Sequence, residues 1–323
     1  MKAERFARLL VLVIVVGLPA LVVAARSASR GPIELRGVMA DEGGWAPAEI
    51  TAQVGQPIQL RLTSDDVIHG FAIGQRDWPA VEVLPGKWTT TTLVFDRPGK
   101  YTFYCTRWCG PNHWRMRGTI EVAGDETATV SEAPPLYVTL HLDLDAPHPG
   151  DVAPVEKPSA ARGAQLNVAP QIAAGAYREQ RPAQVWRYLR DRASSSTLTD
   201  QQVWDLVALA WRSNTTTERL AEGQKLYVEN CAACHGETGK GDGVMAASLQ
   251  TANTSDMPGL IGHGAVTPID FTDARSMLGA NSAILQGKIV RGGMGTGMPY
   301  WGSIFTEAQT WALVDYLWTF QFD

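Results

Sequence analysis

The four cysteines of the chain occur as two close pairs, Cys105 with Cys109 and Cys231 with Cys234, and each pair is followed closely by a histidine. In an exported protein, four cysteines could form two disulfides. Loops this short close poorly into disulfides, and each pair has neighbours that bind metals. We therefore expect the cysteines to act as ligands and attachment points in two separate sites.

The N-terminal segment predicts export. Lys2, Arg5 and Arg8 precede an uncharged apolar run over residues 9–25, which as a helix would span about 26 Å, close to the thickness of the hydrocarbon core. Residues 1–30 therefore fit a single transmembrane helix with a cytoplasmic N-terminus, or a cleaved signal peptide. With either kind of segment, the remaining domains lie on the periplasmic, extracytoplasmic side. If the segment is a transmembrane helix, the protein is a single-pass protein of the cell membrane.

Charge and length narrow the possible functions. The 323 residues suffice for two or three domains. The formal net charge is -5, and the sequence has no long run of either sign. It therefore lacks the clustered positive charge of a protein that binds nucleic acid, and a nucleic-acid-binding function is excluded.

Residues 31–123 predict an all-β domain. β-Branched and aromatic residues alternate with polar ones in short segments separated by turns such as Pro85-Gly86 and Pro98-Gly99. A Greek-key sandwich or barrel is expected. The predicted strands are Glu49–Val54, Pro57–Leu62, Val67–Ile73, Lys87–Phe95, Lys100–Tyr104 and Gly118–Val122.

The first cysteine pair belongs to a dense set of soft ligands. Cys105, Cys109, His113 and Met116 follow one another at spacings of four, four and three residues, and His69 lies upstream in a predicted strand. Sulfur and imidazole together suit copper or zinc. A mononuclear blue-copper site would leave one cysteine over, and a structural zinc site would not need a methionine. Two copper ions bridged by both thiolates would use the whole set and leave no open coordination position, as a site that only passes electrons requires.

This pattern resembles the CuA site of subunit II of haem-copper oxidases, which sits on a cupredoxin fold; the resemblance covers about residues 40–122. It implies that Cys105 and Cys109 bridge two coppers, that His69 and His113 each bind one, and that Met116 and the carbonyl of Arg107 are axial ligands. Many relatives have Glu or Gln at the Arg107 position. The segments 66–71, 81–86 and 97–99 resemble the B-type branch of the family.

The second pair, in Cys231-Ala-Ala-Cys234-His235, matches the attachment motif of a c-type haem. Two thioether bonds would hold the haem, and His235 would be an axial ligand of the iron. The flanking residues resemble class I cytochrome c over residues 217–321, with an all-α fold implied. The sixth ligand is expected in the loop before the last helix, where Met298, followed by proline, is favoured over Met294. His263 is a weaker competitor, because a lone loop histidine is usually solvated.

Between the two sites, residues 124–216 are expected to be a linker and a helical segment without haem. Residues 124–181 are rich in Ala, Pro, Ser and Gly, whereas 182–190 and 199–211 have helical patterns. The sequence of 199–211 is similar to that of 306–318, which indicates an internal repeat of the terminal helix of the haem domain, residues 217–323. Residues 117–230 contain neither Cys nor Met, so the earlier copy binds no haem.

The whole pattern predicts an electron relay. Electrons would enter at haem c from a soluble or membrane cytochrome c or a small copper protein, and leave through CuA to a membrane-embedded subunit I, which by family resemblance reduces oxygen to water. Because the reacting site lies in another chain, a CuA-containing nitric oxide reductase is an alternative. A free membrane-anchored electron carrier is a third. A nitrous oxide reductase needs seven histidines for its catalytic cluster, and the chain has six in all.

Overall fold

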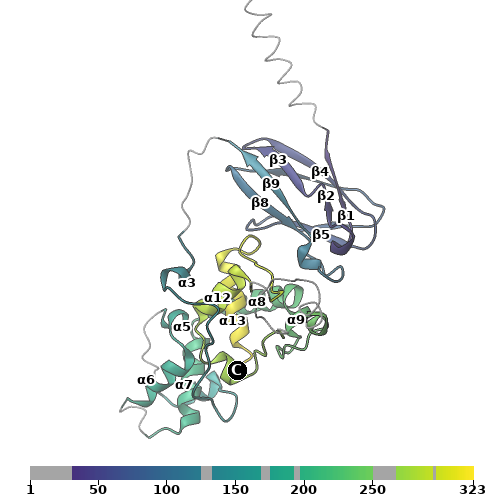
Figure 1. The fold of residues 1–323 in the computed structure, drawn as a ribbon. Helices are drawn as coiled ribbons and strands as arrows, with labels where there is room; N and C mark the ends of the chain where they lie inside the picture. The colour runs from purple at the N-terminus through teal and green to yellow at the C-terminus, as the bar shows by residue number, and fades with distance from the viewer. Residues whose placement is uncertain (1–30, 125–132, 169–174, 193–196, 250–266, 294–295) are drawn as a thin grey trace, which may run out of the picture.

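A computed structural model of the chain describes residues 31–124, 133–168, 175–192, 197–249, 267–293 and 296–323. These residues form a β-domain followed by a helical domain (Figure 1). Residues 1–30, where an anchor or signal peptide is expected, lie outside the described ranges. Within those ranges, every helix is too short or too polar to cross a bilayer.

The β-domain is a sandwich of two sheets, with strand orders β2-β1-β4-β7 and β3-β9-β8-β5-β6. Side chains of alternate residues point into the space between the sheets, where Leu35, Leu60, Phe71 and Phe103 are fully buried. The strands are β1 (Ile33–Gly37), β2 (Trp45–Ala46), β3 (Glu49–Gln53), β4 (Pro57–Ser64), β5 (His69–Ile73), β6 (Val81–Val83), β7 (Thr89–Val94), β8 (Gly99–Tyr104) and β9 (Arg117–Ala123). The expected all-β sandwich is confirmed.

The six strands predicted from alternation correspond to β3, β4, β5, β7, β8 and β9, with ends that differ by a few residues. The sequence does not predict β1, β2 or β6. β1 is set by its parallel pairing with β4, which is distant in sequence, and β2 and β6 are too short to show a period.

The helical domain is formed by short and medium helices around one hydrophobic core. Two of its longer helices, α8 and α13, cross closely, because a Cβ added at Gly223 would lie 2.1 Å from the carbonyl oxygen of Ala312. Only glycine fits there. The helices are α3 (Leu136–Thr139), α4 (Ala160–Gln165), α5 (Ala176–Glu179), α6 (Pro182–Arg190), α7 (Asp200–Arg212), α8 (Thr217–Asn230), α9 (Ala232–His235), α11 (Ala274–Met277), α12 (Ser282–Arg291) and α13 (Glu307–Trp318).

The two helices of the expected internal repeat, α7 and α13, share their start and their packing. Each begins with a capping box, formed by a threonine and the glutamine three residues later. On α7, a Cβ added at Gly163 of α4 would lie 2.3 Å from the carbonyl oxygen of Asp205. Asp205 aligns with Ala312, so the α4–α7 crossing repeats the α8–α13 crossing. This supports the repeat hypothesis.

Residues 133–168 differ from the free linker expected over 124–181. Leu144 is 3% exposed and belongs to the core of the helical domain. Arg291 of α12 donates from Nη1 to Oδ2 of Asp145 at 2.8 Å. Outside α3 and α4 the segment lacks a sequence period because it lies across the helices in an irregular conformation, yet some of its side chains, such as Leu144, join the core of the helical domain.

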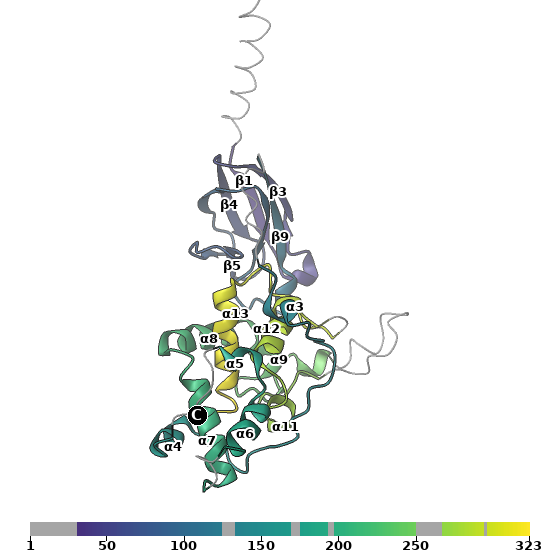
Figure 2. The same cartoon turned by 90° about the vertical axis from the view of Figure 1, so that its left-hand side faces the viewer.

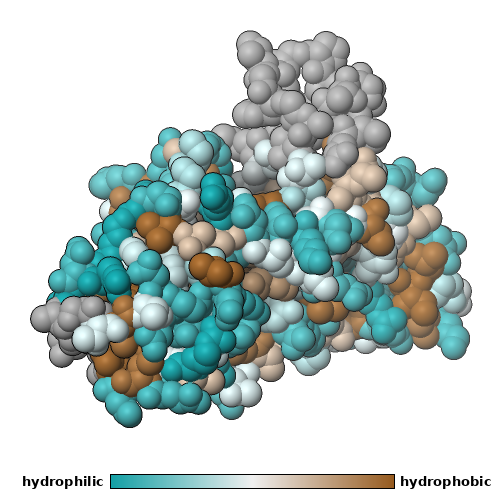
Figure 3. Space-filling model, turned by 90° about the horizontal axis from the view of Figure 1, so that it is seen from below, coloured by the Kyte–Doolittle hydropathy of each residue, from teal (hydrophilic) through white to brown (hydrophobic). Residues whose placement is uncertain are grey.

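The two domains are in contact. In both ribbon views the helical domain lies at the end of the sandwich where β5 begins and β8 ends (Figures 1 and 2). The amide of Gln75, just after β5, donates to the carbonyl oxygen of Ile304 at 2.7 Å. The underside of the molecule has hydrophobic residues in several small groups among hydrophilic ones (Figure 3).

Candidate metal and haem sites

The sheet topology gathers the predicted copper ligands at one end of the sandwich. His69 begins β5, Cys105 directly follows β8, and Met116 directly precedes β9. β8 lies between β5 and β9, antiparallel to both. The start of β5 and the loop from 105 to 116 therefore meet, and the short helix η3 (His113–Arg115) turns His113 inward.

The predicted donor atoms form one compact group. Sγ of Cys105 lies 3.8 Å from Sγ of Cys109 and 3.8 Å from Nδ1 of His69. Sγ of Cys109 lies 3.7 Å from Nδ1 of His113 and 3.9 Å from Sδ of Met116. All five side chains are at most 9% exposed. Among the described residues, His69, Cys105 and Cys109 also form a cluster compact enough to hold a metal ion.

The backbone of Arg107 completes the group. Its carbonyl oxygen lies 3.2 Å from Sγ of Cys105. Its guanidinium lies on the outside, with Nη2 3.3 Å from Oε1 of Glu82, and both of those side chains are more than half exposed. The arginine that replaces Glu or Gln of many relatives therefore keeps its side chain away from the thiolates.

The geometry of the sulfur pair fits metal binding and not a disulfide. A separation of 3.8 Å between Cys105 and Cys109 is far from the S–S bond of about 2.05 Å. It is a distance that a metal ion with thiolate bonds of about 2.3 Å can span. The alternative of two disulfides is thus not supported at this pair, since both cysteines are free.

Electrostatics at the pair also call for a cation. Hydrogen bonding with Cys109 lowers the pKa of the Cys105 thiol, and the same contact raises the pKa of the Cys109 thiol. Ionisation of one thiol disfavours ionisation of the other, and positive charge between them would relieve that repulsion. A buried pair with two imidazoles and a thioether supplies the soft donors that copper binds well.

The histidine on β5 is oriented by an acid that the sequence did not single out. Nε2 of His69 lies 2.8 Å from Oδ1 of Asp66, so Nδ1 faces Cys105. Burial alone would lower the pKa of His69, but hydrogen bonds with Cys105 and Asp66 outweigh it and raise the pKa. A carboxylate on the far nitrogen is the usual support of a metal-bound histidine. The spacing of three residues between Asp66 and His69 is the only local signal for it.

The haem motif lies at the end of the closely packed pair α8 and α13. α9 (Ala232–His235) continues α8 as a short turn, in which the amides of Cys234 and His235 donate to the carbonyl oxygen of Cys231. The hydroxyl of Tyr227 donates to the carbonyl oxygen of Gly236 at 2.8 Å and fixes the end of the motif. These contacts put both thiols and the imidazole on one turn.

The second cysteine pair has a different environment from the first. Burial raises the pKa of Cys231 to about 12 and also raises that of Cys234, so both thiols stay protonated at neutral pH. Burial lowers the pKa of His235, and its Nδ1 lies 3.4 Å from the carbonyl oxygen of Ile269. A neutral imidazole with its Nδ1 engaged presents Nε2 as a ligand.

The expected sixth ligand packs against the helical core. Met298 lies in the loop between α12 and α13 and contacts that core. Its carbonyl oxygen accepts a hydrogen bond of 3.1 Å from the amide of Gly293. Its competitors, Met294 and His263, lie outside the described residues.

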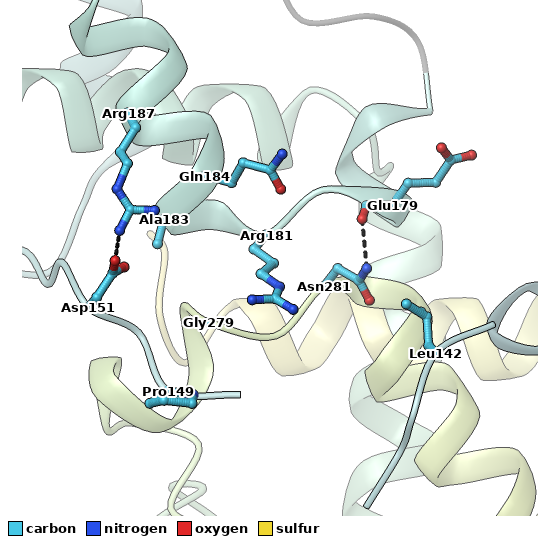
Figure 4. A pocket seen from close by; sticks show the side chains of 10 residues that line it. All are labelled: Leu142, Pro149, Asp151, Glu179, Arg181, Ala183, Gln184, Arg187, Gly279 and Asn281. Carbon is cyan, nitrogen blue, oxygen red and sulfur yellow. Dashed lines mark hydrogen bonds and ion pairs between the residues drawn. The ribbon is translucent and has the colours of Figure 1, made fainter. Parts of the chain in front are cut away.

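A pocket of about 480 Å³ lies elsewhere, on the helical domain. Arg181 and Asn281 line it, and the guanidinium of Arg187 pairs with the carboxylate of Asp151 at its edge (Figure 4). None of the predicted copper or haem ligands lines it. The pocket therefore has no part in the two sites.

The matches to known families divide the chain in the same way, into a β-domain with the copper ligands and a helical domain with the haem motif. Residues 46–123 match the family described as cytochrome C oxidase subunit II, periplasmic domain, and residues 220–321 match the cytochrome c family. The first is a copper-carrying domain and the second a haem-carrying one, and the ligand sets described above fit copper and haem respectively.

Individual relatives match the β-domain. A cytochrome c oxidase subunit 2 of Thermus thermophilus is 42% identical over 85 residues, which are 26% of this chain and 62% of that protein. One from Synechocystis sp. is 34% identical over 76 residues, 24% of this chain and 23% of that protein. The chain thus spans less than two thirds of the length of these relatives.

A chain of a solved heme-copper terminal oxidase dimer is 25% identical, with 38% of this chain and 99% of that chain covered. The TM-score of 0.24 is too low to assign a function. The relatives with the same β-domain are subunits of an oxidoreductase. The family matches and the site geometry thus agree: residues 46–123 are similar to the periplasmic domain of cytochrome c oxidase subunit II, and residues 220–321 of the same chain are similar to cytochrome c.

Proposed function

We propose that this chain is the electron-entry subunit of a membrane-bound haem-copper oxidase. An electron from a donor protein enters at haem c, passes to a binuclear CuA site and leaves to a membrane-embedded subunit I, where oxygen is reduced to water. The proposed haem ligands and attachment points are Cys231, Cys234, His235 and Met298. The proposed copper ligands are His69, Cys105, Arg107 through its carbonyl, Cys109, His113 and Met116.

The observation that carries this proposal is that the end of the sandwich where β5 begins and β8 ends faces the helical domain (Figure 2), and the proposed copper ligands adjoin these strand ends. Tyr104 and Trp114, which adjoin the proposed ligands Cys105 and His113, both pack against the core of the helical domain. Two one-electron sites in two domains of one chain that contact each other suit a relay.

The protein groups at the proposed copper site bury the donor atoms and shield them from solvent. The donors are buried, and Trp45, 2% exposed, packs its ring 5.9 Å from that of His69. When bound, copper and haem iron each supply a reversible one-electron couple. A buried site whose coordination positions are all taken by protein donors would pass electrons with little rearrangement and would perform no bond-making step.

The proposal extends to location and partners. Residues 1–30 would anchor the chain as a single transmembrane helix, with both domains on the periplasmic side. A soluble or membrane cytochrome c, or a small copper protein, would deliver electrons to the haem. The alternative is a CuA-containing nitric oxide reductase, since both would use the same relay.

Purification of the intact complex tests the proposal. With reduced cytochrome c as donor, we expect the complex to consume oxygen, and its copper and haem contents to show two coppers and one haem c in this chain. Consumption of nitric oxide in place of oxygen would establish the alternative. Absence of any donor oxidation by a complex that contains all its metals would refute the relay.

A further inference from the structure

The contact between the two domains is made by the loop of the helical domain that follows Met298. Nη1 of Arg117, at the start of β9, donates to the carbonyl oxygen of Tyr300 at 2.9 Å. On the other side of the loop, the side-chain amide of Gln75 donates to the carbonyl oxygen of Gly302. The loop is thus held at two points by residues of the β-domain.

The guanidinium of Arg117 is enclosed by this loop. It lies 5.0 Å from the ring centre of Tyr300 and 5.1 Å from that of Trp301, distances at which a cation and an aromatic face attract. Its Nη2 is buried, and within the described part of the chain it has no hydrogen-bond partner. A buried, incompletely paired arginine is costly for stability. Its planar group, however, fixes a neighbour in both position and angle.

Arg117 and Tyr300 are each very near a proposed ligand in sequence. Arg117 directly follows Met116, and Tyr300 comes two residues after Met298. The carbonyl oxygen of Met116 also accepts a hydrogen bond of 3.1 Å from the amide of Cys105. The hydrogen bond from Arg117 to Tyr300 therefore joins, across the interface, the chain segments that carry the two sites.

The close fit beside this bond leaves little freedom for the domains to separate and rejoin in other orientations. A Cβ added at Gly74 would lie 2.2 Å from the carbonyl oxygen of Ser303. Backbone of the β-domain at Gly74 is thus in direct contact with backbone of the loop. Such a fit holds for one arrangement of the two domains.

We propose that Arg117 is a positioning residue that clamps the Met298 loop onto the copper-ligand loop, so that electrons pass between the domains from one fixed, docked arrangement. This inference rests on the proposed function. In the step itself, one electron leaves ferrous haem and reduces the oxidised copper site, and no proton or bond is exchanged.

The test measures electron transfer inside the intact holoprotein. One electron is delivered to the haem by a photochemical reductant, and the optical bands of haem and copper are followed in buffers of increasing viscosity. Fixed docking predicts a transfer rate that does not depend on viscosity. In Arg117→Gln, loss of the charged hydrogen bond and the cation–π contacts is expected to slow transfer about tenfold or more and make it viscosity-dependent.

Matched variants distinguish a loss of domain positioning from a folding defect. Arg115→Gln removes an exposed arginine two residues away and should leave the rate unchanged. Gln75→Asn shortens the second contact while keeping a residue type that tolerates the positive φ of 58° at that position, and should slow transfer in the same way. The copper resonance spectrum and the potentials of both centres should be unchanged in all three variants, which a folding defect would not allow.

Two possible results distinguish a failure of the proposed clamp from a failure of the proposed function. If the wild-type protein transfers electrons and Arg117→Gln does so at the same viscosity-independent rate, the clamp is refuted while the relay stands. If the wild-type protein contains both centres and no electron passes between them at any viscosity, the proposed function itself fails.

Discussion

Nε2 of His69 lies 2.8 Å from Oδ1 of Asp66, while Nδ1 of the same ring faces the thiol of Cys105. Asp66 is held in turn by the amide of Met39, which donates to its Oδ2 at 2.6 Å. The loop before β5 therefore fixes the ring that is proposed to bind copper.

Asp66→Asn should weaken copper binding about 10- to 100-fold, because the carboxylate that orients a metal-bound histidine is lost. Competition with a chelator during copper titration measures the change. Asp65→Asn is the matched control, since Asp65 pairs with Arg36 on the exposed surface and should leave the affinity unchanged. Equal affinities for Asp66→Asn and wild type would show that His69 is positioned by packing alone.

Copper uptake by the metal-free site should weaken as the pH falls. Because the pKa of His69 is raised, its imidazole holds a proton to a higher pH than a free histidine, and copper must displace that proton as well as the one on Cys109. Calorimetry in buffers with different ionisation enthalpies should report net proton release. Uptake without proton release would mean that the ligands are already deprotonated in the metal-free site.

Met298→Ala should convert the haem from low-spin His/Met coordination to a form with a weak or absent sixth ligand and lower its potential. Optical and resonance spectra of the ferric protein measure this. Met294→Ala is the comparison, and a loss of low-spin character in that variant in place of Met298→Ala would reassign the ligand.

Gly223→Ala should destabilise the cytochrome c domain by about 1–3 kcal/mol, since the new methyl would overlap the carbonyl oxygen of Ala312. Thermal unfolding followed at the haem band gives the value. Glu222→Ala, on the exposed side of the same helix, should change stability by less. If the two variants melt together, α8 and α13 have room to separate.

Asp273→Ala should cost about 1 kcal/mol at neutral pH, because Asp273 caps α11 through the amides of Arg275 and Ser276. Hydrogen bonding from Ser276 lowers the pKa of Asp273. Its contribution is therefore present above the unfolded pKa and is lost as the pH falls through the folded one. The difference in free energy of unfolding between the variant and wild type should shrink in acid; a constant difference would exclude the ionised cap.

Much of this architecture is predictable because its signals are local. The spacing of Cys105 and Cys109 predicts the cluster, and the threonine caps predict α7 and α13. The packing of residues 133–168 and the clamp by Arg117 are not predictable in this way. Both depend on contacts with residues more than a hundred positions away, and such contacts leave no period or motif in the sequence.

The most direct test of the relay is to observe the partner subunit while this chain lacks its copper site. The complex that carries Cys105→Ser together with Cys109→Ser would be mixed rapidly with reduced donor, and the haem of this chain and the catalytic centre would be followed separately. We expect the haem to reduce at the wild-type rate while the catalytic centre stays oxidised. Rapid reduction of the catalytic centre would show that electrons bypass the copper site, and it would contradict the proposed order of the relay.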